Sequence, residues 1–189
     1  MKNQNDLFKV LIIIVILLFT SCTNSWKTYI VKAGNHSGTG TLQVISGVDE
    51  IEFKFKTDST WYYKMPANPG WNKIRGMSDG HHQLNSSARL GYQCFDDSVL
   101  VVGGYCYMNG VSPQENTDLK GIIDTIQPGK QYHCIIRRED GKYKFYFESK
   151  YWECQAGDSL DWGYLLNPYI GGDFTLDHDW VVKIKDVKP

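Results

Sequence analysis

A group of polar residues close together in the chain could form a ligand-binding site: His81, His82, Asn85 and Arg89. Histidine exchanges a proton near neutral pH, and arginine presents a planar fork of donors that fits a carboxylate. Asparagine offers both a donor and an acceptor to hydroxyl groups. Trp71, a little earlier in the chain, adds an indole face on which a sugar ring could stack. This set suits the recognition of an acidic, hydroxylated ligand.

The element that must position these residues is an extended strand within residues 84–95. Because side chains alternate along a strand, Asn85 and Arg89 would share one face while the opposite face enters a core. The core residues of this strand would be Ala88, Leu90 and Tyr92. Residues 80–82 would form a loop at the rim of the polar face. The alternative is that Arg89 is structural and anchors a 71–83 loop by hydrogen bonds to carbonyl groups.

Composition also favours strands. The 189 residues include six Trp, twelve Tyr and 18 Gly, and lack long heptad-spaced runs of helix-forming residues. The balance of 20 basic and 21 acidic residues excludes a basic nucleic-acid-binding module, and the 42% hydrophobic content excludes disorder. Strand-like segments lie at residues 26–31, 41–45, 50–56, 60–64, 84–95, 99–108, 131–138, 142–148, 151–154 and 180–184. We expect an all-β fold, a two-sheet antiparallel sandwich.

Two patterns fix parts of this sandwich. Residues 51–56 alternate apolar and charged side chains, which predicts that Ile51, Phe53 and Phe55 face the core. Asp140-Gly141 supplies the positive φ angles of a two-residue hairpin turn. That turn would pair Ile136 with Phe145 and Cys134 with Phe147 in a core patch. Residues 121–126 could be a further strand or a helical turn, and residues 118–121 are the one place where we expect a short helix.

The first residues have the layout of a secretory signal peptide, with Lys2 and Lys9 before an apolar run at residues 10–19. The run of about ten residues is too short to span a bilayer. Thr20 and Ser21 directly before Cys22 resemble the lipobox of bacterial lipoproteins, although Phe19 stands where an aliphatic residue is usual. The alternative is an ordinary signal peptide that leaves Cys22 as a free thiol.

This resemblance implies a signal peptide at residues 1–21, a lipidated tether at residues 22–25 with the lipid on Cys22, and a folded domain at residues 26–189. No Asp follows Cys22, so by the sorting rule of such lipoproteins we expect an outer-membrane location, on the periplasmic or the cell-surface side.

Four further cysteines lie within the domain: Cys94, Cys106, Cys134 and Cys154. An exported protein permits two disulfides in three possible pairings, and four buried thiols are an equal alternative. A tight hairpin after Cys94 would place that residue near Val101, so a bridge between Cys94 and Cys106 is geometrically poor.

Two segments go beyond composition. Residues 71–92 lead into residues 101–110, and the run 167–172 is followed by Asp177-His178-Asp179. Together they resemble small secreted proteins of the concanavalin A-like lectin/glucanase type. This resemblance implies a jelly-roll sandwich that binds or cleaves glycans. The paired-carboxylate strand of that family's retaining glucanases, Glu-x-Asp-x-x-Glu, is absent, which argues against retaining glycosidase chemistry.

The leading hypothesis is a lipid-anchored glycan-binding protein with Trp71, His81, His82, Asn85 and Arg89 as the binding residues. The first alternative is a polysaccharide lyase, in which Arg or Asn neutralises a uronate carboxylate and His or Tyr removes the C5 proton. Tyr105 or Tyr107 would supply the hydroxyl that protonates the leaving oxygen, unless both serve only in packing. The second alternative is a non-catalytic envelope protein with a protein partner.

Some further side chains could contact ligand. Four tryptophans are predicted near loops or short strands, where they could stack on sugars: Trp61, Trp71, Trp152 and Trp162. Trp26 and Trp180 are instead predicted in the core. Oxygens of Asp173, Asp177 and Asp179 could bind a hard cation, or could shape a turn by hydrogen bonds to the backbone. No cofactor is expected, and no metal-binding Cys-x-x-Cys pair is present.

The lipid anchor is directly testable. Replacing Cys22→Ala removes the only proposed acylation site and should leave the mature protein in the soluble periplasmic fraction, as measured by cell fractionation and immunoblotting. Continued recovery with membranes would contradict lipidation.

Overall fold

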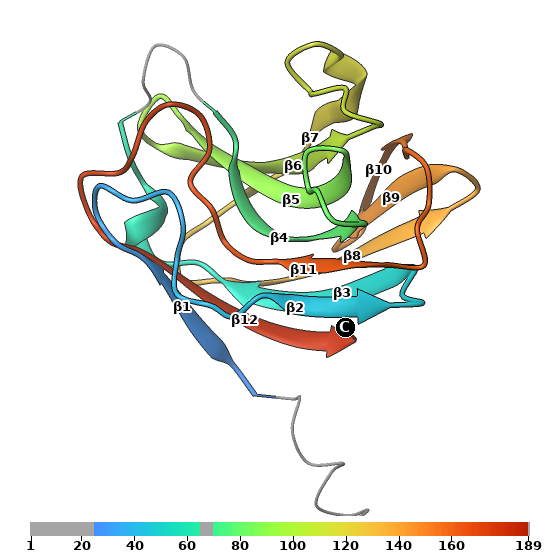
Figure 1. Cartoon of the computed structure of the whole chain (residues 1–189). Coiled ribbons are helices and arrows are strands. Elements are labelled where there is room, and N and C mark those ends of the chain that lie inside the picture. The colour runs from blue at the N-terminus through green and yellow to red at the C-terminus, as the bar shows by residue number, and fades with distance from the viewer. Residues whose placement is uncertain (1–24, 65–69, 189) are drawn as a thin grey trace, which may run out of the picture.

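The computed structural model describes residues 25–64 and 70–188 (Figure 1). The predicted signal peptide and Cys22 lie outside these residues. Within the described part of the chain, no helix is long and apolar enough to cross a membrane.

The described part of the chain folds into two antiparallel sheets of six strands each, which confirms the predicted all-β sandwich of jelly-roll type. We call them sheet A and sheet B. Sheet A has the order β1 (Lys27–Val31), β12 (Trp180–Lys188), β3 (Glu50–Lys56), β8 (Gln131–Glu139), β9 (Lys142–Phe147) and β10 (Lys150–Gln155). Sheet B has the order β2 (Gln43–Ser46), β11 (Trp162–Leu166), β4 (Asn72–Asp79), β5 (Ser86–Phe95), β6 (Val99–Tyr107) and β7 (Lys120–Ile126).

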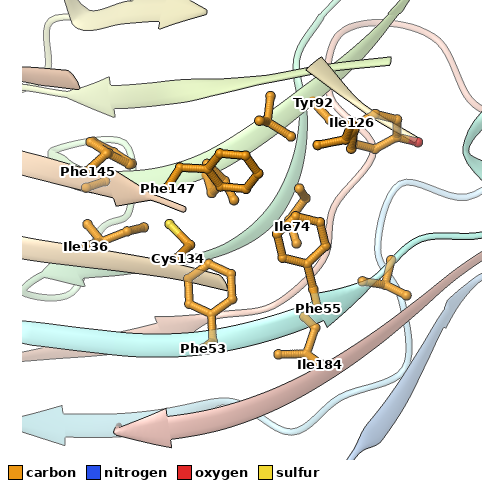
Figure 2. Close-up of a cluster of buried hydrophobic side chains, with 14 of the residues drawn as sticks. Phe53, Phe55, Ile74, Tyr92, Ile126, Cys134, Ile136, Phe145, Phe147 and Ile184 are labelled. Atoms are coloured by element: carbon orange, nitrogen blue, oxygen red, sulfur yellow. The ribbon is translucent and has the colours of Figure 1, made fainter. Parts of the chain in front are cut away.

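The core lies between the sheets and is rich in aromatic rings (Figure 2). Ile51, Phe53 and Phe55 of β3 are fully buried there, as their alternation predicted. The ring of Phe55 stacks on that of Trp61 at 5.7 Å between centroids and lies 6.2 Å from Phe147 of the neighbouring hairpin. These contacts bury the apolar faces that make the two sheets pack together.

The predicted hairpin is confirmed residue by residue. Asp140 and Gly141 have φ angles of 54° and 69°, and they join β8 to β9. Ile136 pairs with Phe145, and Cys134 pairs with Phe147. All four of these side chains are fully buried.

Strand β4 was not predicted, because residues 71–83 were interpreted as a loop. All eight of its residues are buried, although five of them are polar or charged. A bulge between Lys73 and Arg75 shifts the register against β5, so Ile74 and Arg75 both turn toward the core. The Arg75 guanidinium is neutralised there by Asp186, through bonds of 3.0 and 2.7 Å to its two carboxylate oxygens.

Other predicted bounds were also wrong. Residues 60–64 were expected to be a strand, but a 3₁₀ turn, η1 (Ser59–Trp61), forms instead. The reason is Asp58, whose carboxylate accepts hydrogen bonds from the backbone and hydroxyl of Thr60. Strand β11 was missed. Residues 121–126 are part of β7, and η2 (Thr117–Leu119) precedes them.

The four domain cysteines are free, buried thiols in this structure: Cys94, Cys106, Cys134 and Cys154. Cys94 lies opposite Leu100 in the β5–β6 hairpin, and Cys106 lies opposite Ala88, so the predicted poor geometry for a bridge within this hairpin is confirmed.

The hairpin core provides a stability test. Phe145→Ala should lower the free energy of unfolding by about 3–5 kcal/mol, because it leaves a cavity in a fully buried site. As a matched control, Tyr151→Ala removes a half-exposed aromatic ring on neighbouring β10 and should cost at most about 1 kcal/mol. Urea denaturation of both variants measures the difference, and equal losses would contradict the assigned packing.

Candidate functional site

The outer face of sheet B, which points away from the core, carries the candidate site. Leu90 and Tyr92 of β5 are fully buried in the core, so Arg89 between them points to the outer face. In the register of the sheet, Arg89 lies opposite Gly76 of β4 on one side and Tyr105 of β6 on the other. The expected alternation along β5 is thus present.

Strand β4 adds a second cation to this face. Lys73 pairs with Gly91 of β5, and its Nζ lies 4.4 Å from the centre of the Tyr105 ring and 5.7 Å from that of Tyr169. Lys73 is only 6% exposed and Arg89 only 5%. Tyrosine rings attract an ammonium group through their negative faces but do not neutralise its charge.

Neither cation has an acidic partner among residues 25–64 and 70–188. Arg89 donates one hydrogen bond of 2.6 Å from Nη2 to Oε1 of Gln83, and its buried Nε has no protein partner in the same residues. Buried charges in proteins are normally paired, because desolvation without a partner is costly. A ligand carboxylate would supply that partner.

Burial, together with the charge of Arg89, lowers the pKa of Lys73 to about 7. A large fraction of Lys73 is therefore a neutral amine at neutral pH, which is the form that can accept a proton. Burial lowers the pKa of Arg89 as well, but a guanidinium starts from so high a value that it stays charged. The two cations thus differ in chemistry: one can exchange a proton, and the other is a fixed charge.

Two tyrosines of β6 bring hydroxyl groups to this face. Tyr105 accepts a hydrogen bond of 3.1 Å from Nε2 of Gln114, and its ring centre lies 6.0 Å from that of Tyr107. Burial and the neighbouring Tyr105 raise the pKa of Tyr107 to about 12. Tyr107 therefore stays protonated at neutral pH and can donate a proton.

Trp71 packs over two glycines on the same face. A Cβ atom on Gly91 would lie 2.9 Å from Cε3 of Trp71, and one on Gly103 would lie 2.5 Å from Cη2. The indole therefore occupies space that any side chain at these positions would fill. Because Trp71 is only 7% exposed, most of its surface contacts protein, and the expected open stacking platform is reduced to one wall.

Trp71 forms one wall of a hollow of about 470 Å³ beside the tyrosines. Its lining side chains are Trp71, Gln93, Gln114, Lys120 and Asp173. Gln114 connects this hollow to Tyr105 directly through its hydrogen bond.

The structure places the other predicted site residues at a different position. His81, His82 and Asn85 are exposed and line an open hollow of about 540 Å³ at the end of β4 and β5. The His81 ring meets Trp162 edge-on at 4.2 Å. No hydrogen bond or ion pair within the described part of the chain joins a histidine to Arg89; the residue of this loop that reaches the guanidinium is Gln83.

The tryptophans divide differently from the prediction. Trp61 is fully buried rather than available for stacking, and Trp180 is buried as predicted. Trp26, predicted in the core, is partly exposed, with Lys56 Nζ 4.4 Å above its ring. Trp152 and Trp162 are partly exposed.

The candidate cation ligands do not converge on one point. Asp179 bonds to the Lys32 ammonium at 2.6 Å and to the Ala33 amide at 3.0 Å, which is the turn-shaping alternative. Asp177 pairs with His178 at 2.7 Å, and Asp173 lines the hollow near Trp71. Within the described ranges, no group of three or more His, Cys, Asp or Glu residues is placed to hold a metal ion.

Sequence reasoning missed Lys73, Gln83, Gln114 and Tyr169. The bulge beside Lys73 breaks the period-2 pattern that would have marked its face. Tyr169 lies within the 167–172 segment that carries the family resemblance, but only the fold brings its ring over Lys73.

No protein-family model matches the chain, and no curated protein matches its sequence. Its fold is similar to solved structures of alginate lyases. One is Aly36B, solved as a variant with a lysine and a tyrosine replaced by alanine in complex with alginate tetrasaccharide; the TM-score is 0.55 at 13% identity, over 85% of this chain and 78% of that chain.

The alginate lyase from Alteromonas sp. 272 gives a TM-score of 0.52 at 8% identity, over 89% of this chain and 90% of that chain. The marine PL7 alginate lyase AlyA1 from Zobellia galactanivorans gives 0.52 at 9% identity, over 85% and 75%. At these identities the likeness shows the shared sandwich fold.

The charge state of Lys73 is a direct test of the site. In a side-chain NMR titration, the Lys73 amine should titrate near pH 7 rather than near the ordinary lysine value of 10.5. Arg89→Met removes the repelling charge and should raise the Lys73 midpoint. In the wild-type protein, Lys73 binds fewer protons in the folded chain than in the unfolded chain between about pH 7 and 10.5. Lys73 therefore makes the free energy of unfolding increase with pH across that interval. A Lys73 midpoint near the ordinary lysine value of 10.5 would contradict the assignment.

Proposed function

We propose that the chain is a polysaccharide lyase that cleaves a uronate-containing glycan by β-elimination on the outer face of sheet B. The observation that carries this proposal is the pair of buried cations, Lys73 and Arg89, which have no acidic partner among the described residues and lie beside tyrosine hydroxyls. A uronate supplies the missing carboxylate.

Each side chain has a defined role in this reaction. The Arg89 guanidinium binds the uronate carboxylate and offsets its charge, which makes the adjacent C5–H bond more acidic. The neutral Lys73 amine takes the C5 proton, and the electron pair of that bond forms the C4–C5 double bond. The C4–O bond breaks, and the Tyr107 hydroxyl donates a proton to the departing glycosidic oxygen. Exchange with water then returns both groups to their starting states: the Lys73 ammonium releases the proton that it took from C5, and the Tyr107 phenolate gains one.

Lys73 thus takes the role that the sequence alternative gave to a histidine or tyrosine. Its pKa of about 7 is close to the optimum for a general base at neutral pH. Tyr105 covers the amine and, held by Gln114, keeps it desolvated.

The comparisons support the lyase over glycan binding without turnover. The similar structures are alginate lyases, and in Aly36B the replaced residues of the alginate-bound variant are a lysine and a tyrosine, the two types proposed here as base and acid. A polyuronate such as alginate is therefore the first substrate to test.

We also propose that the enzyme works outside the cytoplasm, attached to the outer membrane through Cys22. The apolar leader and the lipobox-like residues before Cys22 support this location. A polymeric substrate that cannot enter the cytoplasm is consistent with it.

The test is release of unsaturated uronates, followed by their ultraviolet absorbance. Lys73→Met, Arg89→Ala and Tyr107→Phe should each lower kcat/KM by about 10²-fold or more, because each removes a group that acts in the transition state. Tyr151→Phe, on an exposed part of sheet A, is the matched control and should leave the rate unchanged. The wild-type rate should rise with pH through about 7, as Lys73 loses its proton.

Two outcomes would overturn the proposal. Binding of uronates without any unsaturated product would favour a glycan-binding protein, and neither binding nor product would favour an envelope protein with a protein partner. Glycan-array binding that survives the double variant Trp71→Ala, Arg89→Ala would overturn the location of the site.

A further inference from the structure

We infer that the hollow beside Tyr105 is a second sugar subsite, in which Lys120 binds the carboxylate of a further uronate of the same polymer. This inference rests on the proposed function and adds a requirement for more than one acidic sugar.

The register of sheet B places this hollow next to the proposed reaction centre. Arg89 of β5, Tyr105 of β6 and Lys120 of β7 lie directly opposite one another in neighbouring strands. They therefore form a row that runs across the strands on the outer face of the sheet. A glycan chain lying across these strands would pass from Arg89 over Tyr105 to Lys120.

The distance between Arg89 and Lys120 in this row is large enough for each to bind a different ligand carboxylate. The strands of Arg89 and Lys120 are two inter-strand spacings apart, roughly 10 Å. Tyr105 lies between them in the register of the sheet. At this separation, a carboxylate held at Arg89 belongs to a different sugar from one held at Lys120.

Lys120 is free to bind a ligand. It is partly exposed, lines the hollow, and takes part in no ion pair within residues 25–64 and 70–188. The other charged group of the lining is the exposed carboxylate of Asp173.

The lining as a whole matches a sugar that carries hydroxyls and one carboxylate. The amides of Gln93 and Gln114 provide donors and acceptors, Asp173 accepts from hydroxyls, and Trp71 provides an apolar wall. Among the described residues that line the hollow, Lys120 is the one cation, so it is the group that selects an acidic sugar. The volume of about 470 Å³ lies within the usual range of small-ligand pockets, ~300–1,000 Å³.

The experiment measures kinetics on purified uronate oligosaccharides of increasing length. For the wild-type protein, KM should fall once the oligosaccharide is long enough to fill the hollow. Lys120→Gln should raise KM for these longer substrates by about tenfold, the loss expected for one charge-assisted hydrogen bond, with kcat within about twofold. Short oligosaccharides should be unaffected.

Two variants control for fold and for general charge. Lys183→Gln removes an exposed lysine from sheet A and should leave the length dependence unchanged. Lys120→Arg keeps the charge and should retain most of the gain with length. Thermal unfolding of every variant verifies the fold.

The outcomes separate this inference from the proposed function. If Lys120→Gln keeps the wild-type length dependence while unsaturated product still forms, the subsite is overturned and the lyase stands. If the wild-type protein releases no unsaturated product from any polyuronate, the proposed function fails, and the subsite fails with it.

Discussion

The burial of two positive charges, on Lys73 and Arg89, sets the requirements for everything around them. Removing a charge from water is costly, so such a site needs partners, a shifted pKa, or both. Gln83 satisfies part of the Arg89 guanidinium, and the ring of Tyr105 faces the Lys73 ammonium. The remaining cost appears as the lowered pKa of Lys73, which leaves a large fraction of this amine unprotonated near neutral pH.

Arg75, on the same strand β4 as Lys73, is a buried cation with a structural role. It is 1% exposed, faces the core, and is fully engaged by Asp186 and Asn167. The Arg75 charge, which joins the two sheets, is therefore neutralised by Asp186. The charges of Lys73 and Arg89 on the outer face have no acidic partner among the described residues. This difference separates charges that hold the fold together from charges that are available to a ligand.

The fold was predictable where one face of a strand is apolar and the other polar. Strand β3 and the hairpin around Asp140 and Gly141 satisfy that condition, so both their location and their register followed from the sequence. Strand β4 violates it, because its two faces are both buried and both carry polar residues. Arg89 could be found from the alternation along β5, whereas Lys73 and Tyr169 are joined only by long-range packing that no local pattern encodes.

The bulge in β4 changes which face of the sheet the residues after it point to. In an uninterrupted strand, residues two apart share a face, and Lys73 would then point the same way as Arg75. The extra residue inverts the parity of the strand at that point, so the two cations are delivered to opposite sides of one sheet. Loss of a single residue, Ile74, would remove the bulge and make the two cations neighbours in the sequence, and regular alternation alone would then keep them on opposite sides of the sheet. With one residue between Lys73 and Arg75, only the bulge places them on opposite faces. The charge on the outer face therefore depends on this backbone irregularity as well as on the identity of the side chains.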